Sequence, residues 1–328
     1  MLLLNKSTIQ NFYSIDDCMH AVTEAFRLFS DGKVNVPLRT QIVKSDNKST
    51  FLCMPAFCEK NNSASVKVLN MFPDNISRGL ASINAQVLNI DAETGAINCL
   101  MDGNYVTQLR TGAASGVAFK FLAKQNCHKG ALIGAGGQAA TQLEAMLIAR
   151  DLDEVQVSDY DFKRAKDFAD QMNEELAKYR TKIVAVSSAN EAVSEADLII
   201  SVTTSKTPVY DGSLVKAGAT VSGVGSYQPQ MQETPLELLQ RAAKIYFDSK
   251  EAVLAEAGDL LQPLQKNQIT QTNFIGELGK VISGELTGRS NDEEIIFFKT
   301  VGIAAQDLMT AKSIYEKARA NQKGLEWE

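Results

Sequence analysis

Histidine is scarce in this sequence, and the cysteines are few and scattered. The chain has two histidines and five cysteines among 328 residues. His20 lies in a segment with helical spacing and His128 in a loop, so both are better explained as surface residues than as catalysts. An enzyme with this sequence would use another general acid, and lysine is the leading candidate. The odd number of cysteines fits a reducing compartment rather than a disulfide framework, and nothing beside Cys53 and Cys58 completes a metal site.

Long apolar runs, internal repeats and a positive net charge are also absent. No run approaches the roughly 20 apolar residues that a membrane helix needs, and the first residues lack the pattern of a signal peptide. The net charge of −6 argues against nucleic acid as the main partner, because phosphate contacts need a basic surface. We therefore expect a cytoplasmic protein that acts on a small molecule, without a membrane or nucleic-acid partner.

The chain is long enough for two domains, each with its own core. Apolar residues at helical spacing predict a helix near Ser14–Asp31, and strand-like runs follow around Thr50–Met54, Ser65–Phe72 and Ile83–Ile90. The turn residues of Asp91–Gly95 are expected to join two strands. This pattern predicts an α+β domain.

Strands and helices alternate from Gly130 onward. The expected strands are Ala131–Ile133, Val155–Ser158, Ile183–Val186, Leu198–Val202, Thr220–Val224, Lys244–Phe247 and Ile295–Phe298. Such alternation is typical of an α/β, Rossmann-type doubly wound parallel sheet. We predict that 118–300 form this domain, and that 1–117 and 301–328 form the α+β domain, with one helix from near Val301 to the end of the chain.

A glycine-rich segment lies between the first of these strands and a predicted helix. Gly134-Ala-Gly136-Gly137-Gln138-Ala139 fits the G-x-G-x-x-A pattern of dinucleotide-binding loops. Gly134 is expected to form the tight turn, Gly136 to let backbone N–H groups approach the pyrophosphate, and Ala139 to let the helix pack on the strand. The alternative is a glycine turn that binds nothing.

Asp159 bears on the choice of cofactor. It ends the next predicted strand, near the usual spacing of about 20 residues for the acid that accepts hydrogen bonds from the adenosine ribose. A carboxylate there would repel the 2′-phosphate of NADP, so the sequence favours NAD(H). Lys163 and Arg164 follow closely and would offset that repulsion, which keeps NADP(H) as the alternative.

Six segments together resemble the ornithine cyclodeaminase/mu-crystallin family, and the resemblance extends over nearly the whole chain. These segments are Val36–Thr40, Val66–Asn70, Leu100–Gly103, Leu109–Ser115, Ala131–Gly137 and Phe298–Asp307. The family includes ornithine and lysine cyclodeaminases, an archaeal type of alanine dehydrogenase, and reductases of cyclic ketimines. The resemblance implies a homodimer whose first domain supplies the dimer contacts and the substrate pocket.

The resemblance also implies roles for single residues. Lys67 would lie beside the reacting carbon and nitrogen as the catalytic residue, and Arg39 and Arg110 would hold the substrate carboxylate, with Val301 lining the pocket. A guanidinium group can form bidentate hydrogen bonds with a carboxylate. A lysine among Val66, Val68 and Leu69 would be desolvated. Besides the glycine loop and Asp159, the implied cofactor-binding residues are Ser82, Arg110, Thr111, Thr203, Val224, Ser226 and Thr300.

One departure from the family pattern concerns Tyr227. Cyclodeaminases and the alanine dehydrogenase carry an aspartate there, which handles the amino group and the attacking water, and Met231 also replaces a family lysine. Reduction of a ready-made imine needs only a hydride and one proton, so we predict an NAD(P)H-dependent reductase of a cyclic imino acid, best matched by Δ1-pyrroline-2-carboxylate going to L-proline. Ornithine cyclodeaminase is the first alternative, and a non-catalytic NAD(P)-dependent ligand-binding protein is the second.

Overall fold

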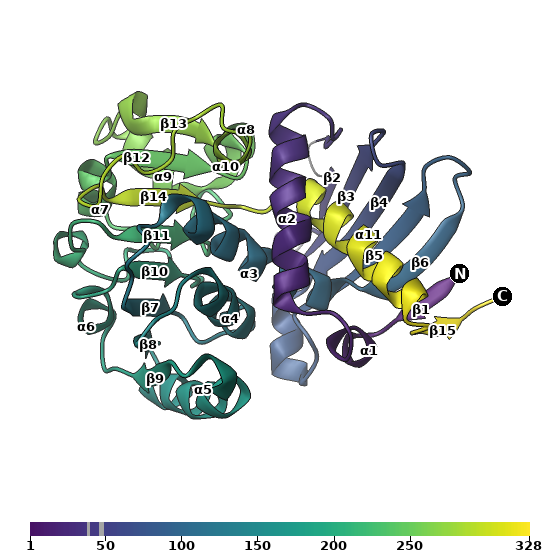
Figure 1. Cartoon of the computed structure of the whole chain (residues 1–328), viewed down its shortest axis with the longest axis horizontal. Coiled ribbons are helices and arrows are strands. Elements are labelled where there is room, and N and C mark those ends of the chain that lie inside the picture. Colours follow the sequence, from purple (N-terminus) through teal and green to yellow (C-terminus); the bar gives the residue numbers. More distant parts are fainter. Residues whose placement is uncertain (38–39, 46–48) are drawn as a thin grey trace. The chain divides into compact units, whose positions relative to one another are not determined.

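The computed structural model describes residues 1–37, 40–45 and 49–328. It divides into two compact units, 1–110 with 303–328 and 111–302 (Figure 1). We call them unit 1 and unit 2. The domain limits predicted from the sequence fall close to these boundaries, and the assignment of a ligand to each domain stays a prediction.

Unit 1 is built on a seven-stranded sheet in the order β15-β1-β6-β5-β4-β3-β2. Its strands are β1 (Leu2–Leu4), β2 (Thr40–Val43), β3 (Thr50–Cys58), β4 (Ser63–Met71), β5 (Ile83–Asp91), β6 (Ile97–Asp102) and β15 (Leu325–Glu326). The strands from β2 to β6 are antiparallel neighbours, whereas β1 runs parallel to β6. The predicted turn at Asp91–Gly95 joins β5 to β6, because the Asp91 carboxylate accepts hydrogen bonds from the backbone N–H groups of Glu93 and Thr94.

Two long helices pack in unit 1. Helix α11 (Ala304–Ala320) contacts β3, β4 and β5 and lies beside α2 (Ile15–Ser30), while α1 (Lys6–Gln10) is a short helix before α2 (Figure 1). Helix α2 begins at a capping box in which Ser14 and Asp17 exchange hydrogen bonds. Strand residues alternate between the two faces of the sheet, so Leu52 and Met54 are buried whereas Phe51 is exposed.

Unit 2 contains an eight-stranded parallel sheet in the order β13-β12-β14-β11-β10-β7-β8-β9. Its strands are β7 (Lys129–Ile133), β8 (Glu154–Ser158), β9 (Lys182–Ala185), β10 (Leu198–Ser201), β11 (Thr220–Gly223), β12 (Lys244–Phe247), β13 (Phe274–Glu277) and β14 (Ile296–Lys299). The strand order reverses beside β7, as in a Rossmann-type sheet, where ligands bind at the carboxyl ends of the strands.

Helices link the strands of unit 2. They are α4 (Ala139–Ala149), α5 (Phe162–Glu175), α6 (Ala189–Val193), α7 (Leu236–Arg241), α8 (Lys250–Glu256), α9 (Gly258–Gln265) and α10 (Leu278–Ile282). Residues 111–122 of helix α3 (Gly103–Leu122) belong to unit 2, and this part of the helix begins with the small residues of Thr111–Gly116. A Cβ atom at Gly112 would lie 2.5 Å from the backbone of Thr141, so glycine allows α3 and α4 to pack backbone against backbone.

Two predictions of secondary structure are wrong. The helix expected from Val301 to the end of the chain ends at Ala320, and β15 follows and pairs with β1. Gly324 has a φ of +103°, which favours glycine and turns the chain back. The expected set of strands also missed β13, whose four residues contain a glycine.

Candidate functional site

The glycine loop of unit 2 leaves room for a phosphate-bearing ligand. Gly134 has a φ of +104°, and a Cβ atom there would lie 2.8 Å from the Val202 carbonyl oxygen, so only glycine fits this turn. A Cβ atom at Gly136 or Gly137 would meet no atom within 4 Å. The loop leads into α4, whose N-cap is Gln138 and whose first residue, Ala139, is buried. Open space before a helix N-terminus fits the pyrophosphate of a dinucleotide.

Asp159 adjoins this loop at the end of β8. Its carboxylate accepts hydrogen bonds from the backbone N–H groups of Ala135, at 2.9 Å, and Asp161, at 3.0 Å. The Arg164 guanidinium lies 3.6 Å from Asp159 Oδ1, the oxygen that accepts from Asp161. Lys163 instead pairs with Asp167, one turn further along α5. Asp159 therefore supports the glycine loop, and its charge is partly balanced by Arg164.

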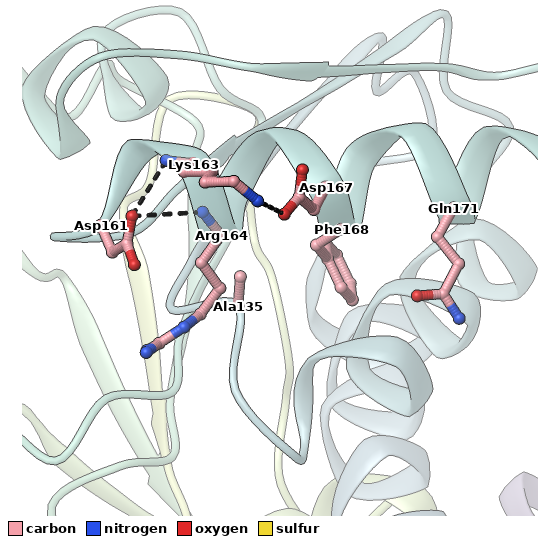
Figure 2. A pocket seen from close by; sticks show the side chains of 7 residues that line it. All are labelled: Ala135, Asp161, Lys163, Arg164, Asp167, Phe168 and Gln171. Atoms are coloured by element: carbon pink, nitrogen blue, oxygen red, sulfur yellow. Dashed lines mark hydrogen bonds and ion pairs between the residues drawn. The ribbon is translucent and has the colours of Figure 1, made fainter.

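A surface pocket opens between the glycine loop and α5 (Figure 2). Its volume is about 410 Å³, and its lining residues are Ala135, Asp161, Lys163, Arg164, Asp167, Phe168 and Gln171. Asp161 caps α5 by accepting hydrogen bonds from the backbone of Lys163 and Arg164 (Figure 2). An apolar ring, two cations, two carboxylates and a glycine-loop residue therefore share one hollow, and this mixed polar and apolar lining suits an adenosine group.

The remaining cofactor residues implied by the resemblance are mostly engaged within the protein. Thr203 donates a hydrogen bond to Glu233, Ser226 donates to the Met231 carbonyl, and Thr300 donates to Asp248. The Thr111 carbonyl accepts from Gln142, and the Val301 backbone N–H donates to Asp248. Val224 is buried at the end of β11, and Ser82 lies in unit 1 just before β5. Contact of these residues with a cofactor or substrate stays a prediction.

Unit 1 contains a buried charge cluster around Lys67. Lys67 in β4 and Asp307 in the first turn of α11 are each 1% exposed, and Lys67 Nζ donates to Asp307 Oδ2 at 2.7 Å. Val66 and Val68 point to the opposite face of the sheet because strand residues alternate. Helix α11 therefore shields Lys67 from water. The lysine ammonium group faces the Asp307 carboxylate rather than apolar side chains alone.

Arg110 completes the cluster from helix α3. Its Nε lies 3.3 Å from Asp307 Oδ1, and its Nη1 donates to the Gln306 side-chain oxygen at 3.2 Å. Burial alone would raise the pKa of Asp307, but the charges of Lys67 and Arg110 hold that pKa below its ordinary value. A guanidinium carries five N–H groups, so Arg110 keeps donors for a ligand carboxylate. Arg39, the other predicted carboxylate ligand, lies outside the described residues.

Asp307 and Gln306 are the site residues that the sequence analysis did not assign. Asp307 lies 240 positions after Lys67, so no local spacing links them. Gln306 accepts from Arg110 and from the backbone N–H of Ile303, which fixes its side chain at the start of α11. The only available signal was their place in the Phe298–Asp307 segment.

Tyr227 follows β11 in the loop where the family carries an aspartate. Its side chain is half-buried, and burial raises the pKa of its phenol above the ordinary value. A neutral phenol of this kind is a poor base at neutral pH. The geometry therefore supports proton transfer at Lys67 and gives no base at Tyr227.

A sequence profile of the ornithine cyclodeaminase/mu-crystallin family matches residues 1–322. The chain belongs to this family. It is 36% identical over 318 residues to a Δ1-pyrroline-2-carboxylate reductase of Bacillus cereus, which covers 97% of each chain. The structure of Thermococcus litoralis Δ1-pyrroline-2-carboxylate reductase in complex with NADH and L-proline is 38% identical over 100% of both chains, with a TM-score of 0.94.

A second solved structure from the same family is an archaeal alanine dehydrogenase dimer with bound NAD. It is 33% identical, with a TM-score of 0.91, and covers 100% of this chain and 99% of its own. The predicted family and the predicted fold class, an α/β protein with a Rossmann-type domain, are thereby confirmed.

Proposed function

We propose that this protein is an NADH-dependent reductase that converts Δ1-pyrroline-2-carboxylate to L-proline. The observation that carries the proposal is the buried cluster of Lys67, Asp307 and Arg110, in a chain similar along its whole length to a reductase solved with NADH and L-proline. The cluster supplies one acid and one carboxylate-binding group, as reduction of a cyclic imino acid requires.

The chemistry divides between the cofactor and the side chains of the chain. NADH supplies a hydride, which forms the new C–H bond at the imine carbon while the C=N π bond breaks. Lys67 supplies the proton to the ring nitrogen, and Asp307 orients the ammonium group by accepting its hydrogen bond. Arg110 fixes the substrate carboxylate, together with Arg39 by analogy with the family pattern.

NADH is the expected cofactor rather than NADPH. The Asp159 carboxylate stands next to the glycine loop, where it would accept hydrogen bonds from ribose hydroxyls and repel a 2′-phosphate. Lys163 is paired with Asp167, so of the two basic residues Arg164 alone opposes that repulsion near Asp159. A wild-type enzyme that preferred NADPH would show that Arg164 determines the choice.

The test is a comparison of two reactions with the same purified protein. NADH oxidation with Δ1-pyrroline-2-carboxylate should exceed ammonia release from ornithine with NAD by at least about 100-fold, a transition-state difference of about 2.7 kcal/mol. The reason is that deamination needs a base where Tyr227 stands. Ornithine turnover equal to imine reduction would establish a cyclodeaminase instead. Binding of NADH without turnover of any five- or six-membered cyclic imine would establish a ligand-binding protein.

The outer face of the unit 1 sheet supports the proposal of a homodimer. Ile42, Phe51 and Val68 lie on the face opposite Lys67, and Ile42 is 64% exposed. Apolar side chains gathered on one face of a sheet mark an interaction surface, and an archaeal relative is a dimer.

No helix of the described residues is long and apolar enough to cross a membrane. All five cysteines lie within the described residues and are free, which supports a cytoplasmic location.

A further inference from the structure

Glu233 joins the carboxyl ends of two neighbouring strands in unit 2. Its side chain is fully buried. One carboxylate oxygen accepts from the Thr203 backbone N–H at 2.7 Å and from the Thr203 hydroxyl at 2.9 Å. The other oxygen accepts from the Gly225 backbone N–H at 2.6 Å. Thr203 follows β10 and Gly225 follows β11, so one side chain fixes both loops.

Two buried side chains of opposite charge, Asp259 and Lys299, support the backbone around Glu233. Burial and the nearby Asp259 raise the pKa of Glu233 itself. Asp259 accepts hydrogen bonds from the backbone N–H groups of Glu233 and Thr234. Its second oxygen lies 3.1 Å from Lys299 Nζ, and both of these side chains are 0% exposed. Lys299 also donates to the Gly223 carbonyl at the end of β11. Since buried charges are costly unless paired, this network specifies one arrangement of the loops.

The loop that Glu233 fixes supports the glycine turn. A Cβ atom at Gly134 would lie 2.8 Å from the Val202 carbonyl oxygen and 3.2 Å from Thr203 Cγ2. A Cβ atom at Gly225 would lie 2.0 Å from the Thr203 carbonyl oxygen, so the two fixed loops also touch each other. A displacement of Thr203 would therefore be transmitted to the turn that begins the pyrophosphate-binding loop.

We propose that Glu233 is a positioning residue for the nicotinamide dinucleotide, acting through Thr203 on the Gly134 turn. The proposal rests on the proposed NADH dependence. The role of Glu233 is to position Thr203 and Gly225, not to contact the reacting atoms. Glu233 fixes the loops that follow β10 and β11 before the cofactor binds. Its loss should therefore weaken cofactor binding and leave proton transfer unchanged.

The experiment measures NADH affinity directly, by calorimetric titration of the purified protein without substrate. Glu233→Gln offers one acceptor oxygen in place of two and cannot hold Thr203 and Gly225 together. Thr203→Val removes only the hydroxyl and keeps the methyl group that packs on Gly134. Each variant should raise the Kd for NADH about tenfold, which corresponds to about 1.4 kcal/mol. The KM for the imine at saturating NADH should stay within about twofold of the wild type, a change of about 0.4 kcal/mol.

Thr234→Val is the matched control. Thr234 is equally buried and follows Glu233, and its hydroxyl has no hydrogen-bond partner among the described residues. Its Kd for NADH should equal that of the wild type. The double variant Glu233→Gln/Thr203→Val should have the same Kd for NADH as the single variant that binds NADH more weakly. The reason is that both changes remove the same interaction, the one between Thr203 and Glu233.

The outcomes separate the two proposals. Additive losses in the double variant would mean that Thr203 meets the cofactor independently, and unchanged affinity in both single variants would mean that the network is structural only. Either result overturns the role of Glu233. Wild-type protein that fails to bind NADH would overturn the proposed function itself. If Glu233→Gln does not fold, Glu233→Asp takes its place in the single and double variants, because its shorter side chain cannot reach both Thr203 and Gly225.

Discussion

Lys67 combines two properties that a catalytic acid needs, burial and a fixed partner. The Asp307 carboxylate holds its ammonium group, and Arg110 shares the same carboxylate. Removal of one partner from such a cluster leaves a buried charge without compensation, which costs about 3–5 kcal/mol. Loss of activity and loss of stability must therefore be separated in any test of Lys67.

Lys67→Met should lower kcat by about 100-fold, the scale of a lost general acid. The same change should lower the free energy of unfolding, measured in urea, because Asp307 loses its nearest cation. The double variant Lys67→Met/Asp307→Asn should recover much of that stability, since the uncompensated carboxylate is gone, while kcat stays low. Near-wild-type turnover in either variant would refute the catalytic role of Lys67.

The sequence predicted single site residues wherever a local pattern or a family segment marks them. Gly134 and Asp159 lie within one strand–helix–strand unit, β7-α4-β8, so a known motif relates them over a short stretch of chain. Asp307 acts on a partner 240 positions away. Glu233 acts on Thr203, only 30 positions away, but no pattern in the sequence links the two. Arg110 was assigned to a ligand carboxylate, but its contact with Asp307 required the fold.

At the scale of elements, helix α2 and the alternating strands of unit 2 were predicted, whereas strands β1 and β15 of unit 1 were not. The helix expected near Ser14–Asp31 is α2, and seven strands of the unit 2 sheet lie where alternation placed them. Strands β1 and β15 have three and two residues, too few to show a period. They exist because distant strands pair with them, and such long-range pairing leaves no trace in local spacing.

Asp197 links elements at the amino ends of the unit 2 strands, opposite the edge at which we propose that the cofactor binds. One carboxylate oxygen accepts from the backbone N–H groups of His128 and Lys129. The other lies 2.9 Å from Lys124 Nζ and 2.8 Å from Lys216 Nζ. Burial alone would raise the pKa of Asp197, but these donors hold it well below the ordinary value.

Asp197→Asn should therefore lower the free energy of unfolding by about 3 kcal/mol at pH 7, since two lysines lose a buried partner. A depressed pKa in the folded state gives stability that is present above the unfolded value of about 3.9 and is lost as the pH falls towards the folded value. The difference between wild type and variant should persist at pH 5 and shrink below about pH 4. Asp153→Asn is the control, because Asp153 is 82% exposed. Equal losses from both substitutions would contradict the anchoring role.

At the scale of the whole molecule, the charges and the apolar surface of unit 1 occupy opposite faces of one sheet. Alternation along β4 sends Lys67 towards α11 and its neighbour Val68 to the outer face, where it is 42% exposed. A second copy that covered the outer face would bury Val68 without blocking the charge cluster. Chemistry and assembly can thus be tested separately at adjacent positions.

Val68→Glu should convert the proposed dimer into a monomer at micromolar concentration, because an unpaired carboxylate would be buried in the interface. Sedimentation velocity or light scattering coupled to size-exclusion chromatography measures the change in mass. Phe162→Glu is the matched control, since Phe162 is an apolar residue of α5 in unit 2 with 48% exposure, and it should leave the mass unchanged. A monomeric wild-type protein, or a Val68→Glu variant that remains a dimer, would contradict the proposal that the outer face of the unit 1 sheet is the dimer interface. A Phe162→Glu variant that became monomeric would place the interface on unit 2 instead.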